Sequence, residues 1–184
     1  MKKILVLAVA LVGFAVTSQA QNASATATQS VSLDLSNAIA ITFTGSGTNT
    51  GGAVTLPFST VADYANGVTS TAQQLKVQSN LAFDVAVKSN ATNFTYTGSY
   101  TTGTTMPVSG VLKLMVTANS TGGSVASPFS TSSYATLTDA DQDLITSGTY
   151  GSNQLFSIQY KAEPGFTYPA GTYTTSVVYT ATQQ

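Results

Sequence analysis

The chain has 184 residues, a formal net charge of −1 and charged side chains at only 7% of its positions. This length allows one domain with a sizeable core, and the weak negative charge excludes the basic surface that nucleic-acid binding requires. The absence of cysteine excludes disulfide bonds and a lipoprotein anchor. Core packing and sheet hydrogen bonds must therefore stabilise the fold.

Residues 1–20 have the three parts of a secretory signal peptide. Lys2 and Lys3 form a positive start, residues 4–16 form an apolar run, and small residues up to Ala20 suit cleavage after that position. The apolar run is shorter than the roughly 20 residues that a membrane-spanning helix needs. We therefore expect a protein that is secreted to the cell surface or medium, through the periplasm in a Gram-negative cell, without a transmembrane anchor.

Residues 22–43 keep one alternation, with an apolar residue at almost every second position. Because successive side chains of a β-strand point to opposite faces, this pattern predicts strand structure with one apolar face. In residues 21–29 the apolar positions are only Ala23, Ala25 and Ala27, which bury little surface. We expect these residues, called the arm below, to be flexible.

Larger apolar side chains begin at Val31, Leu33 and Leu35, and we expect the β-sandwich domain to cover residues 30–184. Residues 31–35 are called the apolar segment below. Two interpretations remain open for it. Together with the arm it forms an assembly strand that adds to the sheet edge of a neighbouring subunit, or it completes its own sandwich.

Further alternating runs follow along the chain at short intervals. Strands are expected at residues 73–79, 81–89, 108–118 and 154–161. The strands on either side of Ser79-Asn80 should pair with each other through that turn. About eight or nine strands without a long helix predict an all-β, two-sheet sandwich.

One short helix is expected near residues 139–146. Thr138 can cap its start, Asp139 and Asp141 place negative charge in its first turn, and Gly148 can end it.

The same acidic run offers weak candidates for a metal site, because Asp139, Asp141 and Asp143 alternate as calcium ligands can. The run departs from the EF-hand loop, however. Leu144 stands where that loop needs glycine, and Tyr150 stands where it needs glutamate. We therefore expect a solvated surface segment and no metal ion or cofactor.

Catalytic chemistry has few residues to use. Histidine, cysteine, tryptophan and arginine are all absent from the sequence, which removes the usual general base, thiol nucleophile and imidazole metal ligand. Carboxylates such as Asp84 and Glu163 remain, but their positions in the sequence do not bring them together. We expect no catalytic residues and a protein that is not an enzyme.

A final strand is expected over residues 172–182, and its apolar positions follow a glycine near the C-terminus. The residues concerned are Gly171, Tyr173, Val177, Tyr179 and Ala181. This run resembles the last strand of the pilin-like domains in spore coat protein U-type secreted proteins, and more distantly that of chaperone-usher pilus subunits. Residues 23–43 are similar to their first strand. The resemblance departs at Gln183, where those pilins favour tyrosine, and in the missing disulfide.

The resemblance implies an immunoglobulin-like sandwich that assembles by strand addition. The function expected first is a non-enzymatic surface structural protein, a fibre or pilus-like subunit whose partners are copies of itself or related subunits. A monomeric adhesin or glycan-binding module is the alternative, since tyrosines recur near loops and suit contacts with sugars or proteins. A secreted hydrolase is a remote third, and it would need two acids close together in a cleft.

Overall fold

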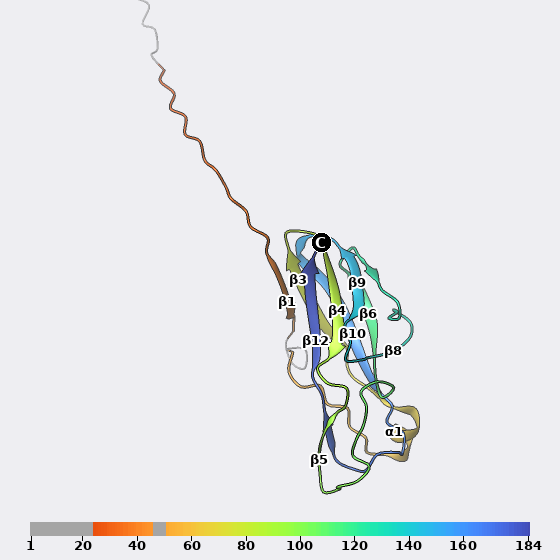
Figure 1. Ribbon diagram of the computed structural model, residues 1–184. Helices are drawn as coiled ribbons and strands as arrows, with labels where there is room; N and C mark the ends of the chain where they lie inside the picture. The colour runs from red at the N-terminus through yellow and green to blue at the C-terminus, as the bar shows by residue number, and fades with distance from the viewer. Residues whose placement is uncertain (1–23, 46–50) are drawn as a thin grey trace, which may run out of the picture. The chain divides into compact units, whose positions relative to one another are not determined.

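The computed structural model describes residues 24–45 and 51–184, and the chain divides into two units, residues 1–35 and 36–184. In the first unit, residues 24–35 form no helix or strand and are all exposed. The second unit is a β-domain with one short helix, α1 (Val61–Asn66) (Figure 1). No helix in the described residues is long and apolar enough to cross a membrane. The expected signal peptide and Ala23 lie outside the described residues.

Two antiparallel sheets make up the body of the domain (Figure 1). In order, the first sheet contains β1 (Ile39–Phe43), β3 (Gln73–Ser79), β10 (Gly151–Ala162), β6 (Leu112–Ser120) and β8 (Ala135–Thr136), and β2 (Val68–Thr69) also pairs with β10. The second sheet contains β12 (Val177–Gln183), β4 (Phe83–Ser89), β9 (Gln142–Gly148) and β7 (Ser124–Val125). A two-stranded ribbon of β5 (Thr95–Thr97) and β11 (Thr172–Thr174) lies at the end of the domain away from the C-terminus.

The hydrophobic core lies between the two sheets. Alternate side chains of β3 and β4 point into it, so that Val77, Phe83 and Val85 are fully buried, as the alternation predicts. Leu114 from β6 and Ile158 from β10 are also fully buried in this core. The all-β sandwich expected from the sequence is confirmed.

The prediction that β3 and β4 pair with each other is wrong. β3 lies between β1 and β10, whereas β4 lies between β12 and β9, so residues 80–82 carry the chain from one sheet to the other. The alternating pattern is the same for a hairpin within one sheet and for a crossing between two. The side chain of Asn80 does not complete a tight turn but bonds the backbone of Ser36 and Ala38, ahead of β1.

The prediction of a helix near residues 139–146 is also wrong, because most of this run is strand β9. Leu144 and Ile145 are both fully buried although they are neighbours, which an irregularity in the pairing of β9 with β4 allows. The helix lies instead at α1. There Asp63 N–H donates to the Thr60 hydroxyl, and the Asp63 carboxylate accepts from Thr60 N–H, which forms a capping box.

Candidate functional site

The two sheets are open along one side of the domain, where β1 and β12 face each other. β1 pairs only with β3 and β12 only with β4, so each has one edge without a partner strand in the described part of the chain. Their inward side chains are only half-buried, including Ile41 and Phe43 of β1 and Val177 and Tyr179 of β12. The core is therefore incompletely covered at this place.

A groove of about 280 Å³ runs between these two edges and is called the β1–β12 groove below. Its lining residues carry no charge; they are Ile41, Thr42, Phe43, Leu75, Val177, Val178 and Tyr179. The groove thus combines an apolar surface with two strand edges that offer backbone hydrogen-bonding groups. An extended peptide with alternating apolar side chains is the ligand that such a surface fits.

Two of the residues that line the groove, Phe43 and Tyr179, are aromatic and contact each other. The rings of Phe43 and Tyr179 meet edge to face, with 6.1 Å between their centroids, and so connect β1 to β12. The hydroxyl of Tyr179 forms a 2.8 Å hydrogen bond with that of Tyr160. Burial raises the pKa of Tyr160 to about 12 and the pKa of Tyr179 well above its usual value. Both hydroxyls therefore stay protonated at neutral pH.

The apolar segment is exposed in the isolated chain. Val31, Leu33 and Leu35 have 80%, 81% and 87% of their surface accessible to solvent, so they add nothing to the buried core. In the described residues, regular strand structure begins only at β1. Within the arm, Ala25 and Ala27 are exposed as well.

The expected final strand divides into two parts with different places in the domain. Val177 and Tyr179 line the β1–β12 groove, and Ala181 continues their half-buried face along β12. Tyr173 belongs to the ribbon, where its ring lies 5.0 Å from that of Tyr96. Gly171 is required beside it, because a Cβ at this position would come within 2.2 Å of the Tyr96 ring.

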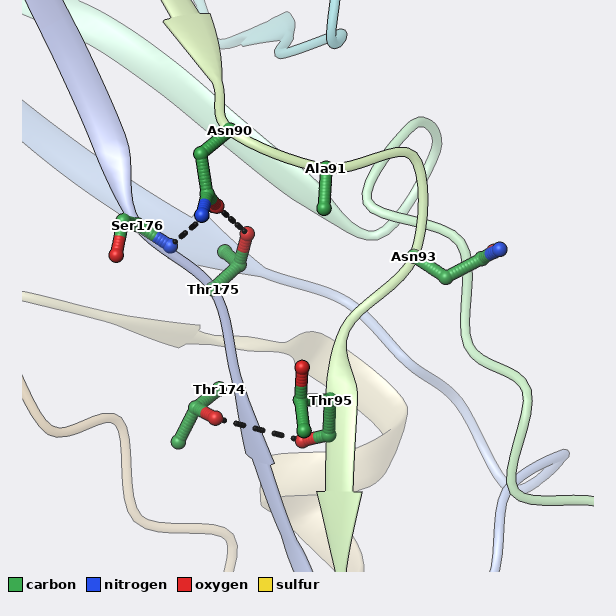
Figure 2. Close-up of a pocket in the computed structure, with 7 residues that line it drawn as sticks. All are labelled: Asn90, Ala91, Asn93, Thr95, Thr174, Thr175 and Ser176. Atoms are coloured by element: carbon green, nitrogen blue, oxygen red, sulfur yellow. Dashed lines mark hydrogen bonds between the residues drawn. The ribbon is translucent and has the colours of Figure 1, made fainter.

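Asn90 binds Thr175 and Ser176, the two residues that separate β11 from β12. Its side-chain oxygen accepts hydrogen bonds from Ser176 N–H at 2.9 Å and from the Thr175 hydroxyl at 3.2 Å (Figure 2). A polar cavity of about 150 Å³ lies beside these contacts. It is lined by Asn90, Ala91, Asn93, Thr95, Thr174, Thr175 and Ser176. None of these side chains titrates near neutral pH, so this cavity offers no acid–base chemistry.

The three acids considered as metal ligands do not form a common site. Asp139 accepts a hydrogen bond from the Thr92 hydroxyl at 2.6 Å, and Asp141 pairs with Lys88 at 3.1 Å. Asp143 is exposed on β9. The described residues contain no group of three acids placed to hold a metal ion.

The remaining acid candidates also have structural partners. Asp84 accepts hydrogen bonds from Ser147 N–H and the Gln184 amide. Hydrogen bonds from Lys113 and Lys161 hold the pKa of Glu163 below its usual range. Neither of the two cavities described above is lined by an acid.

Sequence analysis identified Val177 and Tyr179 but missed the other wall of the groove. Ile41, Phe43 and Leu75, which form that wall, were not singled out in the sequence. The sequence did carry one indication of this wall. The first and last strands of the domain both alternate apolar and polar residues and contain no continuous apolar run. Strands at the chain ends often take edge positions, yet the pattern does not show that two edges meet.

A comparison with models of known protein families finds no match, and none of the characterised proteins is similar enough in sequence to be matched.

Proposed function

We propose that this protein is a secreted, non-enzymatic surface subunit that assembles into a pilus-like fibre by β-strand addition. In the proposed contact, the apolar segment of one copy enters the β1–β12 groove of a second copy. One observation carries the proposal: an open apolar groove and an exposed, alternating apolar segment occur in the same chain. The resemblance of the first and last strands to those of pilin-like domains supports it.

The dimensions of the two parts agree. Five residues in extended conformation span about 16 Å, and β1, which forms one wall of the groove, also has five residues. Val31, Leu33 and Leu35 would share the face that enters the groove. Asp34 would then point to solvent, so no charge is buried in the uncharged groove.

The free energy of inserting the apolar segment is the sum of three terms: apolar burial, chain ordering and hydrogen bonding. Burying three apolar side chains contributes about 1.5–3 kcal/mol each, whereas ordering five residues costs about 1–2 kcal/mol each. These two terms nearly cancel. Hydrogen bonds to the two free strand edges would then give a net gain of about 0.5–1.5 kcal/mol for each bond.

The direction of insertion follows from where the chain leaves the domain. Ala38 lies beside Gln183, so the chain enters the domain at the end where β12 finishes. In a head-to-tail array each apolar segment would insert into the groove of the next copy, which makes an open filament. The inserted strand would therefore run antiparallel to β12.

Peptide binding and electron microscopy test this proposal together. A synthetic peptide of residues 24–38 is titrated into a domain that lacks residues 21–35, and we expect saturable binding that fails for the same peptide with Leu33→Asp. The mature protein should form fibres in micrographs, and the deleted domain should not. A mature protein that stays monomeric, with no peptide binding, would overturn the proposal.

A second candidate, a glycan-binding adhesin, is favoured by an aromatic surface on the loops. Phe166 is 67% exposed and stacks on Tyr64 at 5.4 Å, and Tyr64 also contacts Phe58. Aromatic faces of this kind suit the apolar side of a sugar ring. Phe166→Ala should abolish binding on a glycan array if this surface is the site, and unchanged binding would exclude that location.

A further inference from the structure

A cluster of hydrogen bonds joins the end of β12 to the backbone ahead of β1, where the chain enters the domain. We call it the latch, and it consists of the side chains of Asn80 and Gln183 and the backbone of Ser36 and Ala38. The Gln183 amide donates to Ala38 O at 2.9 Å and lies 2.9 Å from the Asn80 side-chain oxygen. Because Gln183 belongs to β12 and Ala38 precedes β1, the latch connects the two walls of the groove.

Asn80 holds the same stretch of backbone from the other side. Its side-chain oxygen accepts from Ala38 N–H, and its side-chain amide donates to Ser36 O, both at 2.9 Å. Its own N–H also donates to Ala38 O at 3.2 Å. Both backbone groups of Ala38 and the carbonyl of Ser36 are therefore fixed just before β1 begins.

These fixed groups lie at the only place where the chain could turn back on itself. For the apolar segment to enter its own groove, the chain would have to reverse direction within residues 36–38 and run beside β1. Such a tight turn requires the backbone groups of these residues to reorient. Asn37 is a residue type that tolerates turn conformations, so the local sequence by itself does not forbid the reversal.

We propose that Asn80 and Gln183 determine the specificity of strand addition, because the latch prevents the apolar segment from folding back into its own groove. The groove then stays available for a strand from another copy. This inference rests on the proposed strand addition. It assigns a role to Gln183, the position at which the sequence departs from the tyrosine that pilins favour.

The test uses the full mature protein with Gln183→Ala, Gln183→Glu and Asn80→Ala. The glutamate keeps the size of glutamine but, when ionised, cannot donate the hydrogen bonds that the Gln183 amide makes to Ala38 O, the Ser79 hydroxyl and the Asn80 side-chain oxygen. Gln184→Ala is the matched control, because it loses a hydrogen bond of the same kind to Asp84 outside the latch. All variants should melt within a few degrees of the wild type, which shows that the domain remains folded.

Two measurements report on the role of the latch. The first is the rate at which a protease cuts the monomer beside Asp34, the only charged residue among residues 24–35. The second is the rate of fibre formation. A net hydrogen bond corresponds to roughly a 2- to 10-fold change in an equilibrium, and each latch variant loses at least two such bonds. We therefore expect cleavage and fibre formation to slow about tenfold in the latch variants. Gln184→Ala should match the wild type in both rates.

The outcomes separate the two proposals. Latch variants that are cut and polymerise as fast as the wild type would overturn the role of the latch while leaving strand addition intact. Faster cleavage in those variants would also overturn it, since the segment would then be freer and not inserted. A wild-type protein that neither polymerises nor binds the peptide would overturn strand addition itself.

Discussion

Replacing Leu33 with alanine should separate assembly from folding. Leu33 is 81% exposed in the isolated chain, so its truncation should change the free energy of unfolding by less than about 0.5 kcal/mol. In the proposed contact the same side chain becomes buried in the β1–β12 groove. Burial of a leucine contributes about 1.5–3 kcal/mol, and at 1.4 kcal/mol for each factor of ten the affinity should fall roughly 10- to 100-fold.

Isothermal titration calorimetry can measure this loss directly, with peptides of residues 24–38 and the domain that lacks residues 21–35. Ser32→Ala is the matched control, because Ser32 alternates with Leu33 and would face solvent in the inserted strand. Its affinity should stay within about twofold of the wild-type peptide. Equal losses for the two peptides would show that the alternation does not place Leu33 in the groove, and a drop of several degrees in the melting temperature of the full Leu33→Ala protein would show that Leu33 belongs to its own domain.

Three further predictions concern the domain itself. Phe83 is fully buried, so Phe83→Ala should lower the free energy of unfolding by about 3–5 kcal/mol in urea denaturation, and a loss below 1 kcal/mol would contradict its place in the core. Burial raises the folded-state pKa of Tyr160 to about 12 and that of Tyr179 well above its usual value near 10. The stability that their neutral hydroxyls contribute should therefore be complete below pH 10 and disappear as the pH rises through these raised pKa values, through about 12 for Tyr160, as circular dichroism can follow. Thr60→Ala removes the cap of α1 and should cost about 1 kcal/mol, whereas Thr60→Ser should cost much less; equal losses would exclude the hydroxyl contact.

The alternating pattern of the sequence was sufficient to predict the fold class and much of the core. A strand with a period of two residues exposes one face and buries the other whatever its partners are. Phe83 and Val85, in the strand expected at residues 81–89, could therefore be assigned to the core. The exposed alternation at Leu33 was visible by the same rule, and so was the final strand that carries Tyr179.

Some local signals were misleading because they are short and fit more than one structure. Asp139 and Asp141 suit the first turn of a helix, but Leu144 and Ile145 gain more by burial between the sheets as part of a strand. The capping box at Thr60 is an equally local signal. The pair Asn66-Gly67 that follows it is equally typical of an isolated turn, so the local sequence fits either structure.

The sequence by itself determined that this protein is built from strands, many of the side chains that enter the core, and which segment keeps an apolar face. Only the tertiary structure decided that β3 and β4 lie in different sheets, that β1 and β12 leave a groove between them, and that Asn80 and Gln183 bond the backbone ahead of β1. Alternation is a local property that is the same for every possible partner strand. The choice of partners depends on contacts between residues far apart in the chain, such as the bond from Gln183 to Ala38, which no pattern of neighbouring residues contains.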